Sequence, residues 1–236
     1  MSSGKSVIVL IGGGHACGKK TTAMLLKQEL EKTLVNSSIN VELVDMSDYE
    51  EKSTVNYSST TTTAITIDNY EKRQSALKPS RFDFVKIRSF LQNNESNQSQ
   101  TIYLVYGLYA LYDKQLRDMS NIKVFISSDA DVRLIRWIKR DVVNGEKLTL
   151  NYVLNSYLQG AKQEMNNYII TTKEYADVIM PRGADSNAVN LILDGVFKNL
   201  YNVKYGLNIE SYLRPSDDSP VYDQYHDMKH NYYELN

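Results

Sequence analysis

A run of glycines separates a buried strand from an amphipathic helix near the start of the chain. Residues 7–11 are aliphatic without alternation, which is typical of a strand that is buried on both faces of a parallel sheet. Glycines follow, and from Thr21 onward apolar residues recur at helical spacing. A strand, a glycine loop and a helix in this order form the first half of a βα unit, which predicts a parallel sheet with helices packed on it.

The glycine run has the spelling of a phosphate-binding loop. In such loops backbone N–H groups point inward, the helix N-terminus adds partial positive charge, and a lysine reaches the terminal phosphates. The dinucleotide pattern G-x-G-x-x-G does not fit, because Cys17 takes the place of its last glycine. We predict that a nucleoside triphosphate is bound by Gly13, Gly14, His15, Ala16, Cys17, Gly18, Lys19, Lys20 and Thr21.

A cation occupies the metal position of this loop. Phosphate loops of this type end in lysine followed by serine or threonine, whose hydroxyl ligates Mg²⁺. Here Lys20 stands in that place, and an ammonium group has no lone pair and repels a cation. Thr21 is turned by about 100° around the helix and does not simply substitute. The sequence therefore puts magnesium binding in doubt, although Lys20 can neutralise phosphate charge without a metal.

The rest of the chain alternates between strand and helix patterns. This alternation is typical of an α/β fold with a doubly wound sheet, and the length of 236 residues suits a single large domain at about 150 residues per domain. We predict strands at residues 7–11, 41–45, 101–105, 122–126 and 176–180, and helices from residue 21 and over 82–91, 131–143 and 150–168. The polar stretches 53–66 and 92–100 are predicted to be loops.

Composition argues against several classes of protein. With 27 basic and 28 acidic residues, the net charge of −1 does not favour binding to nucleic acid or to a membrane surface. The apolar run at residues 6–12 is far shorter than a membrane span of about 18 to 20 residues, and no signal-peptide layout precedes it. A single cysteine cannot form an internal disulfide. We therefore expect a cytoplasmic protein, without excluding the nucleus.

The end of the chain differs from the rest in charge. Residues 207–236 hold six acids against two basic residues, a net charge of −4, which leaves +3 for residues 1–206 because the whole chain carries −1. We predict a mildly basic body over 1–206, suited to an anionic ligand, and an acidic, tyrosine-rich tail over 207–236. His226 and His230 have helical i, i+4 spacing without a third convincing ligand, so no metal site is predicted there.

Longer motifs lie past residue 100. They read Val-Tyr-Gly-Leu-Tyr-Ala-Leu-Tyr over 105–112, Asp-Ala-Asp-Val-Arg-Leu-Ile-Arg over 129–136, and Lys-Glu-Tyr-Ala-Asp-Val-Ile-Met-Pro-Arg-Gly-Ala-Asp over 173–185. In these motifs the chain resembles the uridine/cytidine kinase family, within the phosphoribulokinase and uridine kinase group of P-loop kinases. The family form of the phosphate loop, G-G-T-A-S-G-K-T-T, matches residues 13–21 at six of nine places.

The resemblance implies a fold and a reaction. The fold is a three-layer α/β fold of the P-loop nucleoside triphosphate hydrolase type, with a mostly parallel sheet, helices on both faces and a small lid. The reaction moves the γ-phosphoryl of ATP to the 5′-hydroxyl of a pyrimidine ribonucleoside, with Mg²⁺ expected from the family. Such transfer depends on positioning and on charge neutralisation, with a carboxylate to orient the acceptor hydroxyl.

The family's acceptor-orienting carboxylate lies in a D-x-F-Y motif after the second strand. Here residues 45–49 read Asp-Met-Ser-Asp-Tyr, so Tyr49 matches the final tyrosine and Met46 falls on the acid. Asp48 or Asp45 can supply the carboxylate if the loop is reshaped. Either can equally be a solvated loop acid.

The family's nucleoside pocket is only partly matched. The family segment D-H-P-D-A-F-D corresponds to Leu-Lys-Pro-Ser-Arg-Phe-Asp at residues 77–83, which keeps Phe82 and Asp83. Together with Tyr49 these are the substrate-binding residues that the resemblance implies. The family's base-contacting histidine has no counterpart, so specificity for uridine is not carried over.

Two further family features are reduced. The family's third strand ends in an acid, where this chain has Tyr106, a residue expected to pack. Family lids carry several arginines over the phosphates; Arg140 is kept, Trp137 replaces one arginine, and Lys147 is the only late cation. The remaining lid cations Arg133, Arg136 and Lys139 can either contact phosphates or only solvate a helix face.

These matches lead to one predicted function and one alternative. The predicted function is a uridine/cytidine kinase of pyrimidine salvage that uses ATP or another nucleoside triphosphate, and that is a homo-oligomer or associates with a related kinase. The alternative, favoured by Lys20, Tyr106 and the reduced lid, is a catalytically impaired nucleotide-binding pseudo-kinase with a regulatory or partner-binding role. The predicted catalytic residues are Lys19, Asp45, Asp48 and Arg140.

Overall fold

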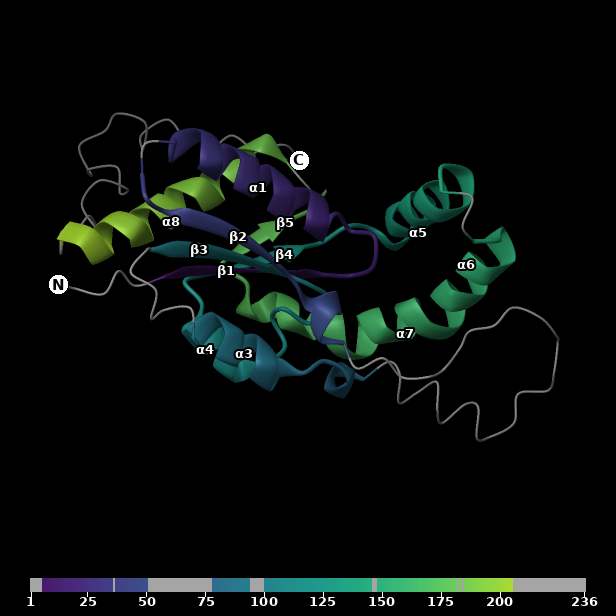
Figure 1. Cartoon of the computed structure of the whole chain (residues 1–236). Helices are drawn as coiled ribbons and strands as arrows, with labels where there is room; N and C mark the ends of the chain where they lie inside the picture. Colours follow the sequence, from purple (N-terminus) through teal and green to yellow (C-terminus); the bar gives the residue numbers. More distant parts are fainter. Residues whose placement is uncertain are drawn as a thin grey trace, which may run out of the picture.

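A five-stranded parallel sheet forms the middle layer of the molecule (Figure 1). The computed structural model describes residues 6–35, 37–50, 78–93, 100–145, 148–181, 183 and 185–205. The strands are β1 (Val7–Gly13), β2 (Asn40–Asp45), β3 (Thr101–Tyr106), β4 (Ile122–Ile126) and β5 (Val178–Met180). They pair in the order β2-β3-β1-β4-β5. All five predicted strands are confirmed, although β5 begins two residues later than the sequence predicts.

Helices cover both faces of the sheet, which confirms the predicted three-layer α/β fold. One face carries α1 (Lys19–Thr33) and α8 (Ser186–Tyr205) (Figure 1). The other carries α3 (Phe84–Asn93), α4 (Lys114–Met119) and α7 (Lys162–Glu164). The helices predicted from residue 21 and over 82–91 correspond to α1 and α3. Neither α4 nor α8 was identified from the sequence.

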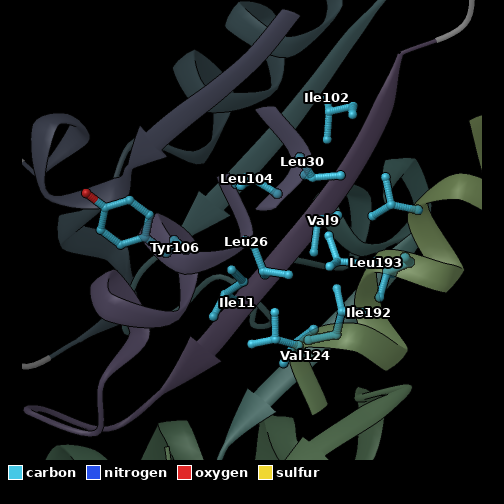
Figure 2. Packing of buried hydrophobic residues seen from close by; sticks show 14 of the residues in the cluster. Val9, Ile11, Leu26, Leu30, Ile102, Leu104, Tyr106, Val124, Ile192 and Leu193 are labelled. Atoms are coloured by element: carbon cyan, nitrogen blue, oxygen red, sulfur yellow. The ribbon is translucent and has the colours of Figure 1, made fainter. Parts of the chain in front are cut away.

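The central strand β1 is buried along its whole length because it contributes to two cores. Successive side chains of a strand point to opposite faces. Val9 and Ile11 therefore pack with Leu26 of α1 and Ile192 of α8 on one face, as Figure 2 shows. The second core lies on the opposite face. It contains Ile8, Leu10, Ile87, Leu91, Leu116 and Ile169.

The predicted lid projects from the sheet as α5 (Ala130–Ile138) and α6 (Leu150–Ser156) (Figure 1). The helix predicted over 131–143 is α5 followed by a π-helical segment at Lys139–Val143. The helix predicted over 150–168 is likewise interrupted by π-helical segments at Tyr157–Ala161 and Met165–Ile169. Both predicted helical stretches are thus confirmed, and both contain π-helical turns, which are frequent near functional sites.

Parallel register places two residues of the predicted site side by side. Asp45 ends β2 and Tyr106 ends β3, and they are direct partners across the two strands. Tyr106 is also the partner of Ile11 in β1, just before the phosphate loop. Ligands of open α/β sheets bind outside the carboxyl ends of the strands, which is the edge where these residues lie.

Several predictions fall outside the described residues. These are the loop at 53–66, the middle of the loop at 92–100, the tail at 207–236 with its two histidines, and Lys147 of the lid. Within the described part of the chain, no helix combines the length and the apolar character that a bilayer span requires.

Candidate active site

The phosphate loop connects β1 to α1 through a backbone that favours small residues. Gly13 has φ +143° and Gly18 has φ +105°, both in the region that glycine adopts readily. A Cβ at Gly13 would lie 2.6 Å from the carbonyl oxygen of Ile126. Gly18 caps α1 without a side-chain hydrogen bond. The first N–H groups of the helix are therefore available to an anion.

A buried arginine of α5 explains the glycine at position 14. A Cβ at Gly14 would lie 2.6 Å from Nη1 of Arg133 and 2.9 Å from Sδ of Met165. Arg133 is only 6% exposed, and its Nε donates to the carbonyl oxygen of Ser128 at 3.1 Å. A side chain at position 14 would displace this buried guanidinium. For Arg133 the interpretation as a solvated helix face is therefore wrong, because the residue packs against the loop.

The loop lysine is held beside the loop itself. Nζ of Lys19 donates to the carbonyl oxygen of Gly14 at 2.6 Å. The first turn of α1 exposes Lys20 and Thr21, whereas the hydroxyl of the buried Thr22 donates to the carbonyl oxygen of Gly18. The two adjacent lysines thus place positive charge where a triphosphate would lie.

An open cleft of about 700 Å³ lies beside the loop, within the range of about 300 to 1,000 Å³ that is common for small-molecule sites. Its walls come from the phosphate loop, α1, the segment after β2, the end of β3, and the lid. The described lining residues are Ala16, Gly18, Lys19, Lys20, Thr21, Met24, Asp45, Met46, Ser47, Glu50, Phe82, Tyr106, Gly107, Leu108, Arg136 and Arg140. The cleft thus joins the phosphate loop to one of the two predicted catalytic carboxylates.

That carboxylate belongs to Asp45. Its Oδ1 accepts hydrogen bonds from the backbone N–H of Ser47 at 2.9 Å and from the Ser47 hydroxyl at 2.7 Å. Burial acts to raise the pKa of Asp45, but the hydrogen bonds from Ser47 and Tyr106 and the charge of Lys20 lower it overall. Asp45 is therefore ionised at neutral pH and faces the loop's positive charge.

Two neighbours of Asp45 differ from what the family motif leads one to expect. Met46, at the place of the family acid, is 1% exposed, and a Cβ at Gly107 would lie 2.5 Å from its Cβ. The acid place thus lies where the core borders the cleft. Tyr106 is buried as predicted, but it also hydrogen-bonds Asp45. In Figure 2 its hydroxyl points away from the apolar cluster.

Other predicted residues lie around the cleft without lining it in the described part of the chain. Asp48 is exposed on the 3-10 turn Met46–Tyr49. Tyr49 packs with its ring 6.4 Å from that of Phe90. Asp83 accepts a hydrogen bond from the backbone N–H of Lys86 at the start of α3, and this bond lowers its pKa. Their predicted roles remain predictions.

The lid contributes two further arginines to the cleft. Nη1 of Arg136 donates to the carbonyl oxygen of Cys17 at 3.2 Å and to the Ser128 hydroxyl at 3.3 Å. Arg140, predicted from the family lid, binds Asp141 through two hydrogen bonds of 2.7 Å. Arg136 therefore fixes the lid to the phosphate loop, while Arg140 is held by its own neighbour.

Sequence reasoning missed a buried charge cluster centred on Glu164. This carboxylate is 1% exposed. Its Oε2 lies 2.7 Å from Nε2 of His15, and its Oε1 lies 2.6 Å from Nη2 of Arg81 and accepts a 2.7 Å hydrogen bond from the Tyr109 hydroxyl. Because a carboxylate only accepts, Nε2 of His15 must carry the proton. A single acid inside the predicted helix 150–168 was the only sequence signal.

Burial and partners have opposite effects on Glu164. Burial alone would raise its pKa, but the hydrogen bond and charge of His15, the charge of Arg81 and the hydrogen bond of Tyr109 lower it below the ordinary value. Burial first, and then the charge and hydrogen bond of Glu164, raise the pKa of Tyr109, although the charge of Arg81 acts to lower it. The cluster is thus a buried network in which three side chains from different segments surround one ionised carboxylate.

The cluster connects the phosphate loop to the lid. The ring of His15 stacks on Trp137 with centroids 5.3 Å apart and planes 10° from parallel. His15 belongs to the loop, Trp137 to α5, and Glu164 to α7. The side chain of His15 therefore points toward α7 and away from the cleft, so its predicted contribution to nucleotide binding is through the backbone.

The donor set at the cleft does not fit a magnesium site of the usual kind. Mg²⁺ takes oxygen ligands from a hydroxyl, from one or two carboxylates and from phosphates. Lys20 stands in place of the hydroxyl, and Tyr106 stands in place of the acid at the end of β3. The charge of Lys20 also acts on Asp45. Among the residues that the structure describes, no group of three or more His, Cys, Asp or Glu could hold a metal.

Comparison with known proteins supports the resemblance seen in the motifs. The model described as "Phosphoribulokinase / Uridine kinase family" matches residues 8–189. "Putative uridine kinase DAS2" of Saccharomyces cerevisiae is 31% identical over an aligned length of 216, and the alignment covers 89% of this chain and 88% of that protein. "Uridine kinase-like protein 3" of Arabidopsis thaliana is 30% identical over 84% of this chain and 44% of that protein. A "Uridine kinase" of Streptococcus pneumoniae is 38% identical over 44% of this chain and 49% of that protein.

Substitution of Glu164 tests the buried cluster. Glu164→Gln keeps the shape but removes the charge that pairs with Arg81, so we expect the free energy of unfolding at neutral pH to fall by about 3 kcal/mol. Because the folded-state pKa of Glu164 is lowered, its contribution is complete above the ordinary glutamate pKa and is lost as the pH falls toward the folded value. The difference between the two proteins should therefore shrink at acid pH.

The measurement is urea unfolding of both proteins at about pH 7 and about pH 4. Glu29→Gln is the control, since Glu29 pairs with Lys32 at 2.7 Å but is exposed. An exposed pair contributes about 0 to 1 kcal/mol. Equal effects of the two substitutions at neutral pH would contradict the buried network.

Proposed function

Because this chain belongs to the phosphoribulokinase and uridine kinase family, we propose that it transfers the γ-phosphoryl of ATP to the 5′-hydroxyl of uridine or cytidine. Cytoplasmic pyrimidine salvage is the setting in which such an enzyme would act. The proposal draws its substrate class from the named relatives and its chemistry from the cleft. The observation that carries it is that one cleft is lined by Lys19 of the phosphate loop and by the ionised Asp45.

In the proposed reaction the loop and the lid hold the nucleotide. The backbone N–H groups after Gly18 and the ammonium of Lys19 contact the phosphates, and Lys20 adds a second positive charge beside them. Arg136 and Arg140 line the same cleft from the lid. These side chains neutralise charge on the transferring phosphoryl, which is the main contribution that a protein makes to phosphoryl transfer.

Asp45 is the proposed acceptor-orienting residue. Its carboxylate accepts a hydrogen bond from the 5′-hydroxyl and aims the oxygen at the γ-phosphorus; ADP leaves, and the hydroxyl proton is released as the new bond forms. The lowered pKa keeps Asp45 ionised, which suits orientation of the hydroxyl more than early removal of its proton. Phe82 also lines the cleft. The backbone N–H of Asp83 donates to the carbonyl oxygen of Tyr49, which keeps these two residues next to Phe82.

A second candidate function is nucleotide binding with little transfer, in a regulatory or partner-binding role. Met46 favours it, because the place of the family acid is taken by an uncharged side chain that is buried against Gly107. In this case the phosphate loop would bind ATP, and the acceptor would remain unphosphorylated. Association with a second copy or a related kinase belongs to the same candidate.

A phosphoryl-transfer assay separates the two candidates. We expect ATP-dependent formation of uridine and cytidine monophosphates. Lys19→Ala should abolish transfer and weaken ATP binding by about 1 to 3 kcal/mol in calorimetry, since a charged contact to phosphate is lost. ATP binding without any transfer would leave the second candidate, and no binding of any nucleotide would refute both.

Asparagine substitutions distinguish the two predicted carboxylates. Asp45→Asn keeps the hydrogen bonds to Ser47 but removes the charge, so we expect kcat for uridine to fall by about 10² to 10⁴. Asp48→Asn should change kcat little, because Asp48 is exposed and is not among the described lining residues. Steady-state kinetics on both variants give the answer. The reverse order of effects would move the acceptor-orienting role to Asp48.

The role of Lys20 can be tested through the metal dependence of binding. Because Lys20 supplies charge where a relative has a magnesium-binding hydroxyl, ATP affinity should be similar in EDTA and in Mg²⁺. In Lys20→Thr, affinity in EDTA should fall by about 1 to 2 kcal/mol, and addition of Mg²⁺ should restore part of it. Calorimetry in the two buffers measures this. A wild-type protein that binds ATP only with Mg²⁺ would show that the cation finds another ligand set.

A further inference from the structure

We propose that Glu50 binds the ribose hydroxyls of the nucleoside. It belongs to the acceptor wall, which is the side of the cleft formed by the described lining residues of 45–50, and it is positioned by Arg81 and, through Arg81, by Glu164. The inference deepens the proposed function and rests on it for the identity of the acceptor. It concerns residues for which neither the phosphate loop nor the family motifs predict a role. The acceptor class it names is a sugar with neighbouring hydroxyl groups.

The backbone places Glu50 on the cleft. Glu50 follows the 3-10 turn Met46–Tyr49 and forms an isolated antiparallel bridge with Phe82. Both residues line the cleft. The side chain of Glu50 is 39% exposed, so its carboxylate can meet a ligand. Glu50 therefore belongs to the wall that also carries Asp45.

Charge divides the cleft into two sides. The described cations of the lining, Lys19, Lys20, Arg136 and Arg140, come from the loop, α1 and the lid. The described acids, Asp45 and Glu50, come from the segment after β2. Carboxylates repel phosphates and accept hydrogen bonds from hydroxyl groups. The nucleotide phosphates therefore belong on the cationic side, and the hydroxyl-rich sugar of the acceptor belongs beside Glu50.

Arg81 forms an ion pair with Glu50 and with Glu164 at once. Nε of Arg81 lies 2.7 Å from Oε1 of Glu50, and its Nη2 lies 2.6 Å from Oε1 of Glu164. The guanidinium carbon lies 5.0 Å from the ring centroid of Phe82 and 5.6 Å from that of Tyr109. A planar fork can bridge two carboxylates and stack on aromatic rings, which a lysine cannot do. Arg81 is thus a positioning residue for Glu50.

Glu164 fixes the position of Arg81. Its own donors are His15 from the phosphate loop and Tyr109 from the segment after β3, and both are bound at 2.7 Å. The phosphate loop through His15, the segment after β3 through Tyr109, and the acceptor wall through Arg81 therefore share one buried carboxylate. Because Glu164 is buried and Arg81 is only 13% exposed, the ion-pair partner of Glu50 is largely removed from solvent. The carboxylate of Glu50 has lone pairs beyond the one that faces Arg81, so it can accept hydrogen bonds from two neighbouring hydroxyl groups.

The test compares uridine with 2′,3′-dideoxyuridine, which keeps the 5′-hydroxyl but lacks the neighbouring pair. Glu50→Gln keeps size and removes charge, so the KM for uridine should rise about 10- to 100-fold, the range for a lost hydrogen bond to a charged group. The KM values for dideoxyuridine and for ATP, and kcat, should stay near those of the wild type. A rise that is equal for both acceptors, or no rise, would overturn the proposal.

Two further variants separate positioning from folding. Arg81→Lys should reproduce the selective rise in the KM for uridine with the KM for ATP unchanged, because lysine cannot bridge Glu50 and Glu164. Glu29→Gln is the matched control: Glu29 is 41% exposed and pairs with Lys32 at 2.7 Å, but it lies on α1 outside the described lining. It should change none of these values. If Arg81→Lys does not fold, Glu50→Gln still decides.

If the wild-type protein shows no phosphoryl transfer, nucleoside binding is measured instead. Calorimetry then measures uridine and dideoxyuridine binding to the wild type and to Glu50→Gln in the presence of a non-hydrolysable ATP analogue. Uridine binding that needs both Glu50 and the ribose hydroxyls would retain the inference while the proposed kinase function fails. Absence of uridine binding to the wild type would overturn the inference as well.

Discussion

Parallel pairing of β1, β2 and β3 in register brings their carboxyl ends to one edge of the sheet. β1 continues into the phosphate loop, β2 ends in Asp45, and β3 ends in Tyr106, which is the direct partner of Asp45. No loop has to fold back to bring these groups together, because the strand ends already meet. The two apolar cores on β1 fix this alignment, since a slip of one residue would exchange the faces of the strand. The site therefore depends on the packing of the sheet.

The buried carboxylate of Glu164 adds a second level of order. It lies on a short helix between π-helical segments and contacts the phosphate loop through His15 and the acceptor wall through Arg81. His15 in turn stacks on Trp137 of the lid. Removing any one partner leaves buried charge or a buried donor without its counterpart, which costs more than the contact itself contributes. The network therefore couples three segments that are far apart in the chain.

The sequence was informative where local pattern and local geometry coincide. The apolar run of β1 and the glycines after it predict both the parallel sheet and the phosphate loop, because burial on two faces and positive φ leave few choices of residue. Contacts between distant segments leave no such pattern. No sequence pattern near Glu164 indicates that His15, 149 positions away, is its partner. The burial of Arg133 was likewise hidden, since an arginine within a helix is usually exposed to solvent.

The departures from the family motifs are coupled in space. In the sequence, Lys20 in the loop and Tyr106 at the end of β3 are two separate replacements of residues that would bind the metal. In the structure both act on one group: the charge of Lys20 and the hydroxyl of Tyr106 each lower the pKa of Asp45. His15 and Arg81, which also depart from the family motifs, meet on Glu164. The four departures therefore lie together in pairs, two of them at Asp45 in the cleft and two at the buried Glu164 behind it.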